Sequence, residues 1–191
     1  NMAGASYLCG YAALRTGAGL VRIFTREENR IILQALLPEG ILTTFSSEGE
    51  AEEKLAEALA WADTVAIGPG LGKEAWAALL VRKTLAEFHG SMVLDADGIN
   101  LAAGHREWLV QHKGPLIVTP HVGEFARLMD QPVAAVSADI PGQAKTCAGK
   151  YQCICVLKDA PTAVALPDGT CWMNPTGNNG MSTAGSGDVL T

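Results

Sequence analysis

The sequence predicts an α/β protein with a mostly parallel central sheet that helices cover on both faces, giving three layers. Short apolar runs of strand length alternate with longer stretches of helical spacing along most of the chain. One late pair of runs is separated only by Pro167-Asp-Gly169, which indicates a hairpin at the sheet edge. Alternation of strand and helix with a single late hairpin is typical of a parallel sheet with helices on its faces.

The first part of the chain carries three predicted helices and two predicted strands. Residues 2–16 place Ala3, Leu8 and Ala12 on one apolar helical face, with Gly17 near the helix end. The next helix stops at Pro38, and the third has an acidic outer face. The strands are expected at residues 19–25 and 41–44, and the other two helices at 27–37 and 50–62.

The remaining elements follow the same order. Strands are predicted at residues 64–67, 91–94, 115–119 and 153–157, and the hairpin strands at 162–166 and 171–173. Helices are predicted from 74 to about 88, from the 120–124 loop to Met129, and within 133–149. We expect a break in the last of these, near Pro141-Gly142.

In such sheets the ligand binds outside the carboxyl ends of the strands, where the following loops gather. Five loops should therefore line one cleft. They span residues 68–72, 95–100, 120–124, 158–162 and 177–188.

Composition narrows the classes of function. With 191 residues, 48% of them apolar, the chain is long enough for one domain with a substantial core. A net charge of −6 and the absence of any long Lys/Arg run argue against a nucleic-acid surface. No apolar run approaches the roughly 18 residues of a membrane span, and the start lacks a basic signal-peptide region, so we expect a cytoplasmic protein.

The five cysteines contain no Cys-x-x-Cys pair, and Cys153 and Cys155 should share one face of a strand as small buried side chains. The four histidines show no ligand spacing with the cysteines, so we expect no metal ligands of the structural-zinc type.

Residues 174–191 carry the clearest chemical signal. Glycines at 177, 180, 185 and 187 lead into the apolar start of a helix, whose first amides have no acceptor within the helix. Gly185 and Gly187 let the backbone approach a bulky oxyanion, and Asp188 follows where a substrate hydroxyl could meet a phosphate. One carboxylate beside a group of amides suits phosphoryl transfer.

With these loops assembled, the chain resembles the ADP-dependent NAD(P)H-hydrate dehydratases of the ribokinase-like superfamily. The Gly-x-Gly-Asp turn alone indicates only the superfamily. Specific to the family are Thr119-Pro-His-Val-Gly-Glu124 and the amino-terminal Ala-Leu-Arg-Thr-Gly-Ala-Gly of residues 13–19. Further matching stretches lie at residues 2–6, 68–72, 95–100, 156–162 and 174–190.

The resemblance implies a ribokinase-like α/β/α sandwich and a repair reaction. The family restores NADH or NADPH from a form hydrated on the nicotinamide ring, using ADP or ATP, and we expect Mg²⁺ with the nucleotide. Asp188 would take the proton from the ring hydroxyl, whose oxygen would attack the terminal phosphate of the nucleotide. Phosphate would then leave, expelled by the lone pair of the ring nitrogen.

The resemblance also implies the residues of each site. Nucleotide contacts would come from Lys158, Asp159, Ala160, Pro161, Thr162, Asn178, Gly185, Ser186 and Gly187. Contacts to the hydrated dinucleotide would come from Ala5, Gly70, Gly72, His121 and Asp188. Asp95 and Asn100 would support the site or coordinate an ion. Read without the motif, Lys158 is a solvated strand end, and Asp95 and Asp97 cap the following helix.

Two departures from the family pattern leave alternatives open. Asp159 stands where the family usually has Gly, which puts nucleotide affinity in doubt. The family domain normally begins before Met2 and continues past Thr191, so residues 1–191 are expected to be one such domain truncated at both ends. The alternatives are a small-molecule kinase of the superfamily, acting on a vitamin or sugar, and a nucleotide-binding module without catalysis. The family often forms tetramers, so we expect a homo-oligomer.

Overall fold

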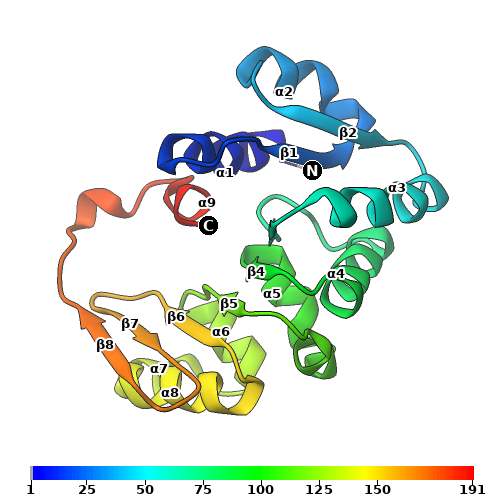
Figure 1. Ribbon diagram of the computed structural model, residues 1–191. Helices are drawn as coiled ribbons and strands as arrows, with labels where there is room; N and C mark the ends of the chain where they lie inside the picture. Colours follow the sequence, from blue (N-terminus) through cyan, green and yellow to red (C-terminus); the bar gives the residue numbers. More distant parts are fainter. Residues whose placement is uncertain (1) are drawn as a thin grey trace.

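The central sheet has six strands in the spatial order β3-β4-β5-β6-β7-β8 in the computed structural model, which describes residues 2–191 (Figure 1). The strands are β3 (Thr64–Ile67), β4 (Ser91–Leu94), β5 (Leu116–Val118), β6 (Ile154–Leu157), β7 (Thr162–Ala165) and β8 (Cys171–Asn174). The first four are parallel, and β7 and β8 are antiparallel additions at one edge. The predicted α/β class, the mostly parallel sheet and the edge hairpin are confirmed.

Helices bury one face of this sheet. The main core contains Met92, Leu94, Val118, Cys155 and Leu157 from the strands. The helices of this part of the chain are α4 (Ala75–Glu87), α5 (Ala96–Ala103), α6 (Val122–Met129), α7 (Val133–Ala138) and α8 (Ile140–Tyr151), with a 3-10 turn at η2 (Arg106–Gln111). Because side chains alternate along a strand, the intervening residues point to the other face, where Val93, Ile117 and Val156 are partly exposed.

The amino-terminal part forms a second, smaller unit. Strands β1 (Arg22–Arg26) and β2 (Ile41–Phe45) pair in parallel, and between them lie η1 (Glu27–Asn29) and α2 (Arg30–Leu36). Helix α1 (Ala3–Thr16) packs with Ile23, Leu33 and Leu37 into a core of its own.

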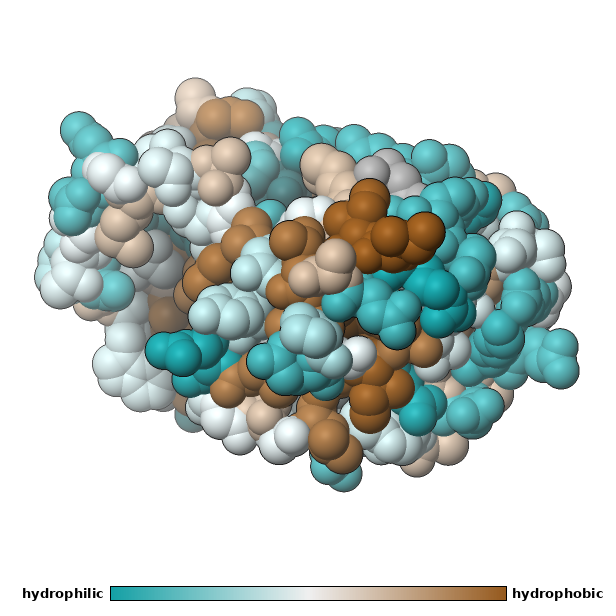
Figure 2. All heavy atoms as spheres, turned by 90° about the horizontal axis from the view of Figure 1, so that it is seen from above, coloured by the Kyte–Doolittle hydropathy of each residue, from teal (hydrophilic) through white to brown (hydrophobic). Residues whose placement is uncertain are grey.

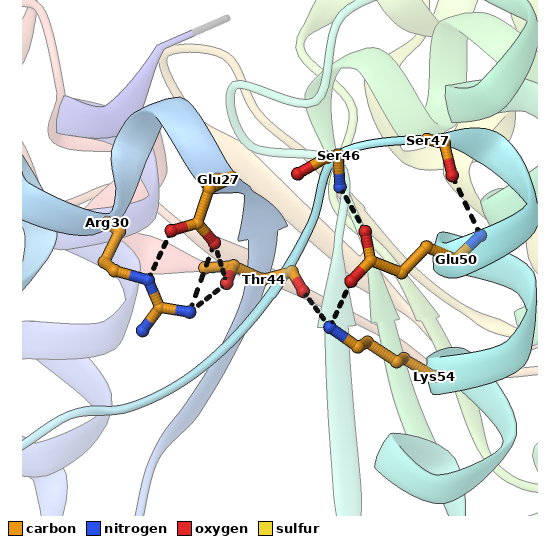
Figure 3. A network of polar contacts seen from close by, with 7 residues as sticks. All are labelled: Glu27, Arg30, Thr44, Ser46, Ser47, Glu50 and Lys54. Carbon is orange, nitrogen blue, oxygen red and sulfur yellow. Dashed lines mark hydrogen bonds and ion pairs between the residues drawn. The ribbon is translucent and has the colours of Figure 1, made fainter.

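A polar network connects this smaller sheet to the helix that follows it, α3 (Glu48–Trp61) (Figure 3). Lys54 of α3 donates to the backbone carbonyl of Thr44 at 2.7 Å, and the hydroxyl of Thr44 contacts Glu27 and Arg30 on the other side. The network comprises Glu27, Arg30, Thr44, Ser46, Ser47, Glu50 and Lys54. Because most of these side chains are partly solvated, the network should contribute little to the free energy of folding. Its main effect is to orient α3 relative to the β1–β2 sheet.

The break that the sequence predicts near Pro141-Gly142 is confirmed, two residues before Pro141. The break lies at Asp139, between α7 and α8, and Pro141 sits in the first turn of α8. Proline is well tolerated there because the first amides of a helix need no intrahelical acceptor. Asp139 completes the start of α8 by accepting from the amide of Gly142 at 3.0 Å.

The exposed side of α2 carries large apolar side chains. Ile31 is 82% exposed, and Ile32 and Leu36 are each 49% exposed. Figure 2 views the molecule from above the position of α2 in Figure 1, and it shows apolar areas among polar ones on that face. Within residues 2–191, no helix is both long and apolar enough to span a membrane.

Candidate active site

The carboxyl ends of the parallel strands meet at one edge, as expected for this topology. The residue after each strand is tied to its neighbour by backbone hydrogen bonds. The amide of Asp95 donates to Ile67, that of Thr119 donates to Leu94, and that of Lys158 donates to Pro120. An isolated parallel bridge joins His121 to Lys158. The loops after β3, β4, β5 and β6 therefore gather side by side.

Asp95 lies at the centre of this edge. Its carboxylate is almost fully buried and accepts from the ammonium of Lys158, with Nζ 2.9 Å from Oδ1. Its other oxygen, Oδ2, accepts from the hydroxyl of Thr191 at 2.6 Å. Lys158 is not a solvated strand end, because its side chain is only 20% exposed and is held in an ion pair.

Asp97, two residues further on, contacts a different loop. Its Oδ2 accepts from the amide of Gly72 at 2.9 Å. Asp95 occupies the N-cap position of α5, but its side chain makes no cap hydrogen bond. The interpretation of these two carboxylates as simple helix caps is therefore wrong. The segment where β4 passes into α5 therefore contacts two neighbouring loops, that of Lys158 through Asp95 and that of Gly72 through Asp97.

Gly68 packs directly against this turn. A Cβ on Gly68 would lie 1.8 Å from the carbonyl oxygen of Asp95, and φ is +128°. Only glycine fits here without moving one of the two loops.

Asp188 belongs to α9 (Ser186–Leu190), a short helix that follows η3 (Asn179–Met181) and packs beside α1 (Figure 1). Partial burial raises the pKa of the Asp188 carboxyl, and the negative charge of Asp95 raises it further, while Lys158 opposes both effects. A carboxylate with a raised pKa is better suited to accept a proton than an ordinary solvated one.

Lys158 also approaches the glycine loop that precedes Asp188. Its Nζ lies 3.8 Å from the point that a Cβ of Gly187 would occupy. Lys158, Gly187 and Asp188 therefore gather in one place, as the sequence predicts. Gly185 is the left-handed N-cap of α9, and the Ser186 hydroxyl is 2.9 Å from that of Thr183.

Two of the residues expected to contact the hydrated ring lie against each other. Ala5 of α1 is buried, and Gly70 packs on it so closely that a Cβ on Gly70 would be 2.9 Å from the Ala5 Cβ and 2.6 Å from the Met2 carbonyl. Gly70 has a φ of +64°. The amide of Met2 donates to the Gly70 carbonyl at 3.4 Å. Both residues are buried, so their small size lets α1 pack closely on the loop after β3.

His121 has a structural role that the sequence analysis missed. It is the N-cap of α6, and its Nδ1 accepts from the amide of Gly123 at 2.9 Å. Glu124 returns a contact to the His121 amide at 3.0 Å, which completes a capping box. With Nδ1 as acceptor, Nε2 carries the ring proton and lies 3.4 Å from Oε1 of Glu124, while the His121 side chain as a whole is 56% exposed. The capping pattern His-x-x-Glu was visible in the sequence.

Other predicted nucleotide residues lie on exposed loops. Asp159, Ala160 and Pro161 are exposed. The Thr162 hydroxyl donates to the Asp159 carbonyl at 3.0 Å, which fixes the turn. Asn178 is also exposed and caps η3 by accepting from the Gly180 amide. Among the described residues, the Asn178 side chain forms no hydrogen bond with Lys158 or Asp188.

The sequence analysis also missed the participation of Thr191 and Cys9. Cys9 of α1 lies close enough to Asp188 and Asp95 that their charges, after burial, raise the pKa of its thiol to about 11. Nothing in the sequence marks either residue, because α1 and the end of α9 meet the edge only in the folded chain. Among residues 2–191, no group of three or more His, Cys, Asp or Glu side chains is arranged to hold a metal ion.

The fold and the loops at this sheet edge identify the superfamily of the protein. The chain has the α/β architecture of the ribokinase-like superfamily. A ribokinase-like superfamily protein from Enterococcus faecalis superimposes with a TM-score of 0.85 at 29% identity, over 98% of this chain and 63% of that one.

The particular family follows from sequence. The family model described as NAD(P)H-hydrate dehydratase matches residues 1–191, and the chain belongs to that family. It is 39% identical to a bifunctional NAD(P)H-hydrate repair enzyme of Moorella thermoacetica, over 100% of this chain and 37% of that protein. It is 34% identical to the ADP-dependent (S)-NAD(P)H-hydrate dehydratase of Bacillus subtilis, over 100% of this chain and 66% of that protein.

A solved structure of the Bacillus subtilis ADP/ATP-dependent NAD(P)H-hydrate dehydratase, co-crystallised with ATP and Mg²⁺, has a TM-score of 0.81 at 33% identity. The match covers 99% of this chain and 65% of that one. The chain thus spans between about one third and two thirds of the length of these relatives.

Proposed function

We propose that this protein is a hydro-lyase that dehydrates the S-epimer of hydrated NADH or NADPH, using ADP or ATP as the phosphoryl donor. The observation that carries the proposal is the position of Asp188. This carboxylate stands beside the Asp95–Lys158 ion pair, next to the glycine loop, with a raised pKa. Membership of the dehydratase family and the similarity to the ADP-dependent (S)-NAD(P)H-hydrate dehydratase of Bacillus subtilis support the same chemistry.

In the proposed reaction Asp188 accepts the proton of the ring 6-hydroxyl. The oxygen attacks the terminal phosphorus of the nucleotide, and the bond from that phosphorus to the bridging oxygen breaks. The lone pair of the ring nitrogen then expels inorganic phosphate, and loss of the C5 proton restores the C5=C6 bond. The protein supplies position and charge stabilisation, which is what phosphoryl transfer requires.

Lys158 is the cation of the proposed nucleotide site. Its ammonium keeps two N–H donors free after the bond to Asp95, and these can face a phosphate beside Gly187. The inner part of the proposed nucleotide site consists of Lys158, Gly185, Ser186 and Gly187. The 159–162 loop and Asn178 would make outer contacts to the nucleotide. Mg²⁺ usually reaches such sites with the phosphates and few protein ligands, which suits a chain whose described residues offer no ligand cluster.

The hydrated dinucleotide would bind at this edge near Ala5, Gly70 and Gly72, where small residues let α1 and the loop after β3 pack closely. His121 would donate to it from Nε2, since Nδ1 is used as an acceptor in the cap. We further propose a homo-oligomer, with a tetramer as the form to test first by light scattering. A cytoplasmic location stays a prediction from the sequence.

The experiment follows the return of dihydronicotinamide absorbance when the full-length protein meets NADH-hydrate, ADP and Mg²⁺. Repair should require the nucleotide, and Asp188→Asn should slow it by roughly 10²–10⁴-fold while ADP still binds. Asp168→Asn, in the exposed turn between β7 and β8, is the matched control and should repair at the normal rate. Normal repair by Asp188→Asn would overturn the proposal, and a stable phosphoester of another alcohol would indicate the kinase alternative.

A further inference from the structure

Asp95 is a buried carboxylate that contacts neither substrate in the proposed mechanism. It is 2% exposed, and both of its oxygens are engaged by residues far away in the chain. Lys158 follows β6, and Thr191 ends α9. A buried carboxylate is costly unless it is paired, so these two partners hold the geometry firmly.

We propose that Asp95 is the positioning residue of the nucleotide site, fixing the Lys158 ammonium beside Gly187 and fastening the end of α9 to the end of β4. This role rests on the proposed function of Lys158 as the phosphate-binding cation. It differs from that function because Asp95 would touch neither substrate.

The geometry explains why such a residue is needed. A lysine has a flexible four-carbon stem and three rotatable N–H donors, so its charge is poorly placed without a partner. One bond to Asp95, 2.9 Å long, fixes the position of Nζ and directs the remaining donors away from the buried carboxylate. The Thr191 hydroxyl reaches both Asp95 and the Gly187 carbonyl, at 2.6 Å and 3.1 Å, so the same carboxylate orders the glycine loop.

A purely electrostatic role would have the opposite sign. A negative charge beside a phosphate site repels the phosphate, so removing it would tighten nucleotide binding. Positioning predicts that removal of the Asp95 charge weakens binding, because Lys158 and α9 lose their anchor. The direction of the change therefore separates the two explanations.

The test measures Mg-ADP affinity by calorimetry in the full-length protein, without the hydrated substrate. Asp95→Asn should weaken ADP binding roughly tenfold, as expected when a charge-assisted hydrogen bond is lost. In a Lys158→Ala background the same substitution should weaken binding by no more than about threefold, because only the bond to Thr191 is left to lose. Asp63→Asn removes an exposed carboxylate at the amino end of β3 and should leave affinity unchanged.

Three results would overturn the proposal: unchanged or tighter binding in Asp95→Asn, an equal loss in both backgrounds, or an effect as large in Asp63→Asn. Thr191→Val leaves the ion pair intact and tests the second bond, should Asp95→Asn fold poorly. It should weaken ADP binding by about threefold without raising the KM for the hydrate. Unchanged ADP affinity in Thr191→Val would refute the link to α9. A wild-type protein that binds ADP but does not repair the hydrate would refute the proposed function. The ADP affinities of the variants would still test the role of Asp95.

Discussion

The ammonium of Lys158 and the carboxylate of Asp95 form an ion pair that spans 63 residues of sequence, with Nζ and Oδ1 2.9 Å apart and side chains only 20% and 3% exposed. Buried pairs of this kind contribute little net stability, because desolvation offsets their attraction, but removing one partner is expensive. The pair is therefore better understood as part of a site than as a stabilising device. Four predictions test the surrounding structure.

The first concerns pH. Because burial and Asp95 raise the pKa of Asp188, the repair rate should fall on acidification at a pH above the ordinary Asp value of about 3.9. A carboxyl whose pKa is raised on folding favours the folded state when protonated, and this contribution is lost as pH rises through the folded pKa. Asp188→Asn should therefore melt at a higher temperature than wild type at pH 7. The difference should vanish below about pH 4, and a lower melting temperature at pH 7 would contradict it.

The second uses Cys9 as a reporter of the same charges. Its pKa of about 11 should leave it almost unreactive towards iodoacetamide at pH 8. Asp188→Asn removes one of the charges that raise this pKa, so alkylation of Cys9 should become faster. Peptide mapping by mass spectrometry measures the rate. Glu39→Gln serves as the charge control, because Glu39 is an exposed carboxylate in the loop after α2. An equal acceleration of Cys9 alkylation in Glu39→Gln would argue against a specific effect of Asp188 on Cys9.

The third separates the two roles of His121. His121→Ala should lose the cap of α6 and destabilise the protein by about 1 kcal/mol. His121→Asn keeps a capping side chain but not the exposed Nε2–H, so its melting temperature should stay close to wild type. Both variants should raise the KM for the hydrate. A normal KM in His121→Asn would restrict this histidine to the cap.

The fourth concerns the close packing of Gly70 against Met2 and Ala5. Gly70→Ala places a Cβ 2.6 Å from the Met2 carbonyl at a positive φ, and it should cost about 1–3 kcal/mol of unfolding free energy. Gly149→Ala is the control, because this helical glycine of α8 has open space around it and should gain up to about 1 kcal/mol. Chemical denaturation measures both. A Gly70→Ala protein as stable as wild type would show that the Met2 segment moves aside easily.

Most of the fold could be predicted from the sequence, because strands β3 and β4 coincide with uninterrupted apolar runs between clear loops. The helix break was expected near Pro141, and the capping carboxylate of Asp139 places it two residues earlier. Local chemistry of this kind decides boundaries more than the presence of proline does.

The candidate site was predictable only where its residues sit in a recognisable motif. Asp188 and Lys158 belong to such stretches, and the structure places them close together beside Gly187. The bonds from Asp95 to Lys158 and Thr191 span 63 and 96 residues, so no local pattern encodes them. The role of His121 in the cap was encoded locally, by a glutamate three residues later, but histidine is an unusual capping residue.

The close packing of Gly68 on the Asp95 carbonyl makes the loop after β3 and the start of α5 depend on each other. Any side chain at position 68 would push the β4–α5 turn outward, and with it the carboxylates that support Lys158 on one side and Gly72 on the other. A substitution at position 68 should therefore disturb the Lys158 side and the Gly72 side of this edge together.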